Sequence, residues 1–390
     1  MSTFAQVAVA EADDRSVLSG PEYRVLHVVN GEHYAGAERV QDLLAEYLPE
    51  YGVEVGFACV KPAAFPERRH YRKAPCWSVP VTHPWPRGAA RELSELAAGE
   101  AFDAIHAHTP RSLWAALPAA RRCGLPIVYT MHDVNLAEVD APHRQWIKRR
   151  TMRLLRQVDM VLAVSPAALD IADQRKLGRQ RRLVPNGVPT QPARGPFVPG
   201  KQLVVGTVAL LRPRKGVETL IDAVGSLRRQ GVDMVLRLTG PFESAEYERF
   251  VRRELERQSM VADDVLCGHV RDVPDALRKL DLFVMPSLLP EGRPMVVMEA
   301  MAVGLPVVGS DVAGVRDLIR HQVDGALVPP GDSHRLAEAI RWTLTDGDRW
   351  QRLSEQSHRR QQSLFSAERM AERTAAVYRQ LLAETARPRG

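Results

Sequence analysis

Two glutamates, Glu291 and Glu299, flank a short segment of this chain that is otherwise almost entirely apolar. Pro294 lies between them, and proline is favoured at the first position of a helix, where its missing N–H costs nothing. A helix is therefore predicted to begin near residue 294, with free N–H groups and the positive end of its dipole available to an anion. Glu299 would lie more than one turn inside this apolar helix, where a carboxylate needs hydrogen-bond donors. Ligand hydroxyls beside a bound phosphate would serve, which indicates a nucleotide sugar.

A cationic turn is the second candidate element. The segment 206–216 follows an apolar run and contains Arg212, Arg214 and Lys215 before a closing glycine. Point charges next to a helix N-terminus can hold a diphosphate. A basic surface turn would look the same in isolation. The functional interpretation gains weight because this turn and the 291–299 segment are expected at the same end of one sheet.

The first half of the chain contributes a glycine turn and a histidine pair. Gly36 lies in a turn after the first apolar run, where the backbone could approach a phosphate closely. The turn matches neither the dinucleotide fingerprint nor the phosphate-binding loop, and a plain strand–helix turn is the alternative. His106 and His108 end another apolar run. We expect alternation to send the two imidazoles to opposite faces, so that His108 reaches the cleft and His106 does not; a histidine satisfied within the core is the alternative.

Short apolar runs alternate with helical patterns in both halves, which is typical of parallel sheets covered on both faces. The predicted strands are 23–29, 53–60, 104–108, 127–130 and 160–164 in the first half, and 203–208, 234–239, 265–268, 282–285, 306–309 and 326–328 in the second. The predicted helices include 37–48, 112–122, 217–229, 274–280 and a final one over 365–382. A proline- and glycine-rich linker is expected over 184–201. The pattern predicts an α/β fold of two Rossmann-like, doubly wound domains that face each other across a ligand-binding cleft.

Composition narrows the class of protein. Hydrophobic residues make up 45% of the 390 residues and charged residues 26%, which suffices for two packed domains. The four cysteines are scattered without metal or redox spacing, and the first 20 residues lack a signal-peptide pattern, so we expect a cytoplasmic protein. No binding motif for nucleic acid is present. Asp346 and Asp348 resemble a metal-binding pair but lie between predicted terminal helices, and we predict no metal site.

The positive charge is concentrated between Arg144 and Arg182, in a chain whose net charge is +6. Part of this region, 143–157, is predicted to form a basic amphipathic helix that carries Trp146. Such a helix could lie on an anionic membrane surface. An ordinary solvated helix face is the alternative. We predict a peripheral contact with the inner face of the membrane through this region.

Together these motifs resemble glycosyltransferase family 4, a family of retaining, metal-independent enzymes with the GT-B architecture. The resemblance spans roughly residues 23–382. Its most specific part is the segment 291–299, which matches the Glu-x7-Glu motif of the family. Shorter matches follow in the family's order, at 36–38, 106–108, 164–165, 185–188 and 215–216.

The resemblance implies a division of the chain and a role for each part. The expected parts are a disordered tail over 1–20, an N-terminal acceptor-side domain over 21–190, a C-terminal nucleotide-sugar-binding domain over 191–364, and a crossover helix over 365–390 that packs on the first domain. The implied reaction is a retaining transfer of a hexose from a nucleotide-diphosphate sugar, a UDP- or GDP-sugar, to a glycan or lipid-linked acceptor. No cofactor or metal is implied. Synthesis of a cell-surface polysaccharide or glycolipid is the expected setting.

Residue roles follow from the same resemblance. Glu299 would bind the ribose hydroxyls, Glu291 would contact hydroxyls of the donor sugar, and His108 would lie near the anomeric centre. The remaining donor-binding positions are implied to be Lys215, with Pro294, Met295 and Val296, at the diphosphate; Gly36 on the phosphate side of the first domain; and Val270 near the base.

Two positions depart from the family pattern. Leu210 stands where an arginine is usual, so we expect Arg212 to supply that charge, with Arg214 as the alternative. Ala35 stands where a second glycine is common. These departures leave two other functions open: a GT-B-type nucleotide-sugar epimerase and a non-catalytic sugar-binding homologue.

Overall fold

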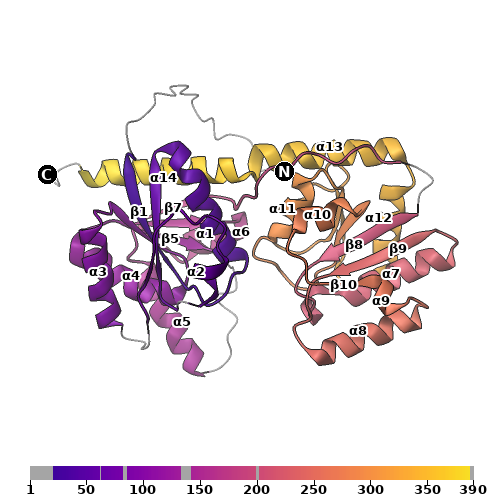
Figure 1. The fold of residues 1–390 in the computed structure, drawn as a ribbon, viewed down its shortest axis with the longest axis horizontal. Coiled ribbons are helices and arrows are strands. Elements are labelled where there is room, and N and C mark those ends of the chain that lie inside the picture. Colours follow the sequence, from indigo (N-terminus) through magenta and orange to yellow (C-terminus); the bar gives the residue numbers. More distant parts are fainter. Residues whose placement is uncertain (1–20, 62, 82–85, 133–141, 199–201, 387–390) are drawn as a thin grey trace.

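The computed structural model describes the chain apart from residues 1–20, 62, 82–85, 133–141, 199–201 and 387–390 (Figure 1). The predicted disordered tail therefore lies outside the described residues. The described chain forms two parallel β-sheets, each with helices on both faces, as the alternating sequence pattern predicts. The α/β class and the two Rossmann-like sheets are confirmed.

The first sheet has the strand order β3-β2-β1-β4-β5-β6-β7. Its strands are β1 (Tyr23–Val29), β2 (Val53–Cys59), β3 (Cys76–Ser78), β4 (Ala104–Ala107), β5 (Ile127–Met131), β6 (Met160–Ala163) and β7 (Gln180–Leu183). Its helices are α1 (Gly36–Tyr47), η1 (Leu48–Tyr51), α2 (Ala64–Arg68), α3 (Arg87–Gly99), α4 (Pro110–Cys123), α5 (Pro142–Leu155) and α6 (Pro166–Gln174). The strand order reverses between β1 and β4, and a crevice opens at such a switch point beyond the carboxyl ends of the strands.

The second sheet has the order β10-β9-β8-β11-β12-β13. Its strands are β8 (Leu203–Val208), β9 (Met234–Thr239), β10 (Leu266–Gly268), β11 (Leu282–Met285), β12 (Val307–Ser310) and β13 (Ala326–Val328). Its helices are η2 (Pro213–Lys215), α7 (Val217–Arg229), α8 (Ala245–Arg257), α9 (Ala262–Val265), α10 (Val273–Arg278), α11 (Met295–Ala302) and α12 (Ser333–Leu344). The cationic turn follows β8 and the two-glutamate segment follows β11. These strands are paired neighbours at the switch point, so both segments begin at one end of the sheet.

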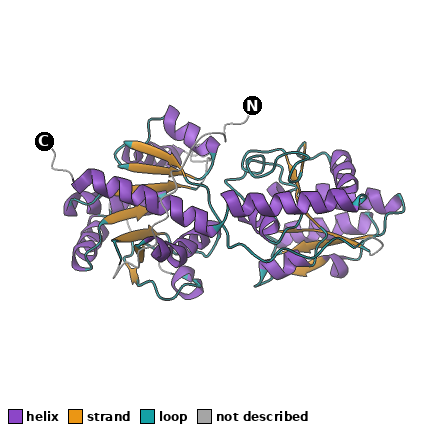
Figure 2. Cartoon of the chain, turned by 90° about the horizontal axis from the view of Figure 1, so that it is seen from above, coloured by secondary structure: helices purple, strands orange, loops and turns teal. Residues whose placement is uncertain are grey.

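Two long helices, α13 (Gly347–Leu364) and α14 (Ala367–Ala386), run along one side of the molecule and span both sheets (Figure 2). α13 packs against α11 of the second sheet, whereas α14 packs against α1 and η1 of the first. Trp350 anchors α13, since its side chain is fully buried and its Nε1 donates to the carbonyl of Asp281 at 2.8 Å.

The chain crosses between the two sheets twice, and the two crossings are bonded to each other. Val188 donates to the carbonyl of Phe365 at 2.9 Å, and Ala367 donates to the carbonyl of Val188 at 3.0 Å. A Cβ atom at Gly187 would lie 2.1 Å from the carbonyl oxygen of Ser366. Gly187 is therefore required for this close approach of two backbones, and not only for a tight turn.

Candidate functional site

Glu291 lies in the loop between β11 and α11 and is only 8% exposed. Its Oε1 accepts hydrogen bonds from Lys215 Nζ at 2.9 Å and from Ser287 Oγ at 2.8 Å. Arg214 Nη2 lies 4.0 Å from the same oxygen. This buried carboxylate is thus matched by cations of the turn after β8, as a charge in a low-dielectric position must be.

The turn that carries Lys215 is held in place by its backbone. Leu288 donates to the carbonyl of Arg214 at 2.9 Å. Gly216 has φ +60°, and a Cβ atom there would lie 2.2 Å from the carbonyl oxygen of Pro286. A glycine is therefore needed both for the left-handed backbone and for the contact between the two loops. Burial lowers the pKa of Lys215, an effect that Glu291 opposes.

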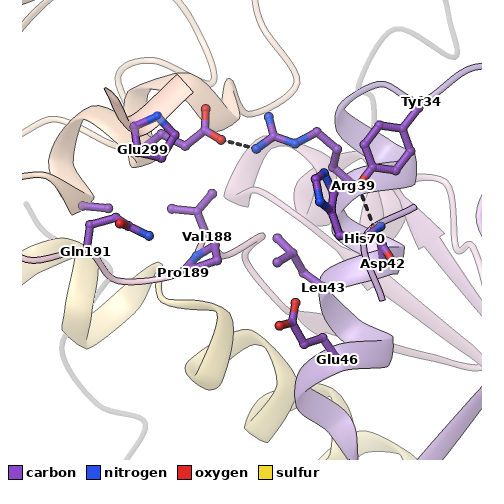
Figure 3. A pocket seen from close by; sticks show the side chains of 12 residues that line it. Tyr34, Arg39, Asp42, Leu43, Glu46, His70, Val188, Pro189, Gln191 and Glu299 are labelled. Carbon is purple, nitrogen blue, oxygen red and sulfur yellow. Dashed lines mark hydrogen bonds and ion pairs between the residues drawn. The ribbon is translucent and has the colours of Figure 1, made fainter. Parts of the chain in front are cut away.

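Glu299 lies in the second turn of α11 and is 5% exposed. Its carboxylate pairs with the guanidinium of Arg39, which reaches across from α1 of the other domain (Figure 3). Burial alone would lower the pKa of Arg39, but the charge and hydrogen bond of Glu299 outweigh it and raise that pKa. Helix α11 begins at Met295, with Pro294 in an extended conformation just before it, one position away from the predicted role of this proline.

A cavity of about 300 Å³ lies between the domains at this ion pair. Arg39 and Glu46 of α1 line one wall, and Glu299 and Pro274 line the other. Figure 3 shows the Arg39–Glu299 pair across this space, with Glu46 below it. Asp42 also lines the cavity, but its carboxylate is engaged by Tyr34 Oη at 2.7 Å and by the backbone N–H groups of residues 70 and 71.

The glycine turn of the first domain approaches the N-terminus of α11. A Cβ atom at Gly36 would lie 3.8 Å from Met295 Sδ, an ordinary van der Waals separation. Ala35 caps α1 with φ −120° and ψ −164°, an extended conformation that any residue adopts. The alanine that departs from the family pattern is therefore unstrained in this backbone.

His108 lies at the carboxyl end of β4 and is 3% exposed. The prediction that His106 and His108 point to opposite faces is wrong, because their rings are stacked with centroids 4.0 Å apart. Residues two positions apart along a strand share one face, and this periodicity was available from the sequence. Within the described residues, the hydrogen bonds of His108 go to His27, Ser112 and His132 and not to the second domain.

Arg212 and Val270 lie apart from the two buried carboxylates. Arg212 Nη1 is 3.3 Å from Glu243 Oε1, whereas Arg214 is the arginine within ion-pair distance of Glu291. Val270 is half-buried in the turn between β10 and α10. Leu210, at the position where the family usually has an arginine, is 43% exposed.

Asp346, one of the two aspartates whose spacing resembles a metal-binding pair, caps helix α13. Its carboxylate accepts a hydrogen bond from the N–H of Arg349 at 3.0 Å, so this side chain has a structural role.

Sequence reasoning missed Arg39 and Ser287, and it left His132, which follows the strand after the His106–His108 pair, without a role. Arg39 follows directly after the Gly36–Glu38 motif, but its partner lies far along the chain and in the other domain. No local pattern reports such a pair. Ser287 lies four residues before Glu291, and its role depends on the course of the loop.

The site thus combines two buried carboxylates, the cations Lys215, Arg214 and Arg39 that lie beside them, and a helix N-terminus, in a cleft between two doubly wound domains. This combination defines the GT-B class of glycosyltransferase. Residues 34–192 match the family described as Glycosyltransferase Family 4, and residues 202–346 match the family described as Glycosyl transferases group 1. The chain belongs to the family 4 glycosyltransferases.

Individual relatives agree with this assignment. The chain is 26% identical over 328 residues to the MMP α-(1→4)-mannosyltransferase of Mycolicibacterium hassiacum, an alignment that covers 78% of this chain and 77% of that protein. It is 29% identical over 256 residues to the phosphatidyl-myo-inositol mannosyltransferase of Mycobacterium leprae, with 61% and 63% covered. Among solved structures, Anabaena HepE in complex with UDP superposes with a TM-score of 0.78 at 22% identity, covering 92% of this chain and all of that one.

The protein is therefore a glycosyltransferase of a family that acts in polysaccharide and glycolipid synthesis. In the part of the chain that the structure describes, no helix has both the length and the apolar character needed to cross a membrane.

The buried histidines predict an acid-sensitive first domain. Burial lowers the pKa of His27 to about 3 and of His132 to about 4, and places the pKa values of His106 and His108 well below the usual range. Unfolding exposes these groups, which then take up protons below about pH 6.5. Stability is therefore complete above that pH and is lost as the pH falls, by up to about 1.4 kcal/mol per pH unit for each histidine.

Urea unfolding at pH 7, 6 and 5 measures this slope. We expect His27→Gln to lower stability at pH 7 but to make the dependence on pH shallower. His334→Gln is the matched control, because the His334 side chain is 82% exposed. An equal slope in the wild type and His27→Gln would contradict the assignment of the acid sensitivity to this cluster.

Proposed function

We propose that the protein transfers a hexose from a UDP- or GDP-sugar to a glycan or lipid-linked acceptor, with retention of configuration and without a divalent metal. The observation that carries this proposal is the pair of buried glutamates at the switch point of the second sheet, each matched by a cation. Both carboxylates can accept hydrogen bonds from ligand hydroxyls once their cations move. The two relatives described above are named as mannosyltransferases, and HepE was crystallised with UDP, which supports a nucleotide-sugar donor.

The donor would lie across the N-terminus of α11. In this assignment Glu299 binds the ribose hydroxyls, Glu291 contacts the donor sugar, and Val270 lies near the base. The diphosphate would meet Lys215, the N-terminus of α11 over residues 294–296 and the Gly36 turn opposite it. Arg212 and Arg214 add positive charge to the same turn. These roles agree with the position of Gly36 opposite Met295, at the N-terminus of α11.

Cleavage of the bond between the sugar and the diphosphate places positive charge on the sugar and negative charge on the leaving group. Lys215, the neighbouring arginines and the helix N-terminus would stabilise the leaving group, and preorganised charges are most effective in a water-poor site. Losing one such group typically costs about 2.7–4 kcal/mol of transition-state stabilisation. Because the protein supplies these cations itself, a divalent ion is not required. The acceptor hydroxyl would attack the sugar from the same face from which the leaving group departs, near His108.

A first experiment tests the donor site by calorimetry with UDP-, GDP- and ADP-sugars. One nucleotide series is expected to bind, and Glu299→Gln and Lys215→Ala are each expected to weaken that binding by about 10- to 100-fold, the value of one charge-assisted hydrogen bond. Unchanged affinity in both variants would contradict this donor site.

Arg39→Gln is the matched variant for this measurement. Arg39 occupies the Glu299 carboxylate in the nucleotide-free protein, so its removal frees an acceptor for the ribose. We expect nucleotide affinity to be equal to or higher than that of the wild type. A loss comparable to that of Glu299→Gln would mean that Arg39 binds the nucleotide itself.

A second experiment concerns the reaction course. With the donor and acceptor in hand, excess EDTA is expected to leave the initial rate unchanged. Proton NMR of the product is expected to show the same anomeric configuration as the donor. An EDTA-sensitive rate restored by Mg²⁺, or an inverted product, would contradict the corresponding part of the proposal.

A third experiment tests the proposed contact with the inner face of the membrane through Arg144–Arg182. Within this region the turn between α6 and β7 carries Arg175 and Arg179, and β7 carries Arg181, which is bonded to Asp173 at 2.6 Å. Vesicles that contain anionic lipid are expected to bind the protein at low salt and release it at high salt, because exposed charges are screened. Binding that is equal for neutral vesicles, or absent at low salt, would contradict the contact.

A further inference from the structure

Two of the four cysteines meet inside the first domain, although they lie 17 positions apart along the chain. Cys59 ends β2 and Cys76 begins β3, and these strands are parallel neighbours in the sheet. The two Sγ atoms lie 3.7 Å apart. A disulfide needs its sulfur atoms about 2.0 Å apart, so a small adjustment would bring the pair to that bond. The sequence has no redox spacing because only the fold brings these positions together.

Strand β3 can follow Cys76 toward β2 at little cost. It spans three residues and forms one edge of the sheet, with β2 as its neighbour. A shift of such a short edge strand disturbs few backbone hydrogen bonds. Cys59, by contrast, is fully buried at the end of β2, a strand that lies between β1 and β3. The bond would therefore form mainly by movement of Cys76 toward Cys59.

The surroundings of the pair favour an ionised sulfur at Cys76. The hydrogen bond from Cys59 lowers the pKa of Cys76, burial opposes this effect, and the nearby charge of Arg69 adds to the lowering. The same hydrogen bond, together with burial, raises the pKa of Cys59. Arg69 is held in place by the carbonyls of Tyr71 and Ala74, to which its guanidinium donates. Cys76 is also partly exposed whereas Cys59 is buried, so an oxidant from solvent meets the more reactive sulfur first.

The Cys59 side chain supports the loop between β1 and α1. A Cβ atom at Gly31 would lie 3.1 Å from both Cβ and Sγ of Cys59, so the backbone at Gly31 packs directly on this side chain. The carbonyl of Gly31 accepts a hydrogen bond from the N–H of Phe65 at 3.1 Å, which ties the loop to the segment after β2. The loop then continues to Gly36, opposite Met295 of the second domain. A displacement of the Cys59 sulfur therefore acts on the first domain's side of the cleft.

We propose that Cys59 and Cys76 are a redox-sensitive pair, which a peroxide converts reversibly to a disulfide beneath the loop between β1 and α1. The disulfide ties β3 to β2 and draws the Cys59 sulfur away from Gly31. Transfer to the acceptor slows in the oxidised protein, because the loop that leads to Gly36 loses the side chain on which it packs. This effect on transfer rests on the proposed function, whereas formation of the disulfide does not.

The oxidation proceeds in two steps. The thiolate of Cys76 attacks one oxygen of hydrogen peroxide, the O–O bond breaks, and the other oxygen leaves as water after it takes up a proton, so that Cys76 becomes a sulfenic acid. The sulfur of Cys59 then attacks the sulfenic sulfur, an S–S bond forms, and the S–O bond breaks. The departing hydroxide takes the proton of Cys59 and leaves as water. Two thiols and one peroxide thus give one disulfide and two waters, and the thiols supply both electrons.

Mass spectrometry of the full chain tests the bond. We expect treatment with hydrogen peroxide, followed by digestion without reductant, to give a linked peptide that contains Cys59 and Cys76 and that dithiothreitol separates. Cys76→Ser is expected to give no such peptide. The matched control is Cys123→Ser/Cys267→Ser, which keeps the pair and removes the two cysteines whose Sγ atoms bond to backbone carbonyls. Absence of the linked peptide from this control and from the wild type would overturn the proposal.

Rates of transfer test the effect on the site. We expect oxidation of the wild type to lower the rate by about tenfold, since misplacing site groups by about 1 Å can cost up to about a hundredfold. Dithiothreitol is expected to restore the rate. Cys76→Ser, given the same peroxide treatment, is expected to keep its rate, which separates the disulfide from oxidation elsewhere. Circular dichroism and thermal melting of reduced Cys76→Ser establish that this variant is folded.

The outcomes distinguish this inference from the proposed function. Equal rates for the reduced protein and for the protein that carries the disulfide would overturn the effect on transfer. An equal, reversible loss of rate in Cys76→Ser would overturn it as well, because no Cys59–Cys76 bond can form there. A reduced protein without transfer activity would instead contradict the proposed function, and the linked peptide would still decide whether the disulfide forms.

Discussion

A carboxylate that is almost excluded from water must be matched by a cation, and the site between the two domains depends on this constraint. Glu291 is matched by Lys215 within the second domain, whereas Glu299 is matched by Arg39 from the first. Nucleotide binding at this site would therefore be an exchange of partners, in which ligand hydroxyls replace cations at the carboxylates. Lys215, once released from Glu291, is then free to face the diphosphate. Because Arg39 belongs to the first domain and Glu299 to the second, this exchange would also break an ion pair between the domains.

The topology brings these groups together before any side-chain detail matters. β8 and β11 are adjacent, and the strand order reverses between them. The turn with Lys215 and the loop with Glu291 therefore leave the sheet at the same end. The glycine contact at residue 216 then fixes how closely the two loops approach. Lys215 reaches the carboxylate of Glu291 because the backbone already holds the two loops in contact.

The sequence was sufficient to predict the alternating strands and helices of the two sheets. Strands buried on both faces appear as short apolar runs, and several predicted ones, such as 23–29, 203–208 and 234–239, match the structure residue for residue. β7 was missed because it is a basic edge strand, where charges protect an exposed edge and no apolar run appears. β3 was missed because it spans only Cys76–Ser78.

The sequence predicted those site residues that stand out from their immediate neighbours along the chain. Glu299 inside an apolar helix is such a local signal. Its pairing with Arg39 is not, because the partner lies in another domain and no periodicity connects the two positions. The same holds for Tyr378, which is one polar residue on an amphipathic helix until the tertiary fold brings it between the imidazoles of His27 and His106. The stacking of His106 on His108 is different, since correct use of the strand period would have predicted it.

The buried histidines of the first domain also constrain how α14 docks. A buried polar network is favourable only when its members are bonded, and the Tyr378 hydroxyl bonds His27 and His106 at once. A shift of α14 by one residue would remove that hydroxyl and leave two buried imidazoles without it, so the network selects one register. Because α14 continues from α13 through the crossing that is bonded to residue 188, a fixed register holds that crossing against the first domain. Relative movement of the domains would then pivot about the paired crossings at 187–188 and 365–367, and such movement would open or close the Arg39–Glu299 contact.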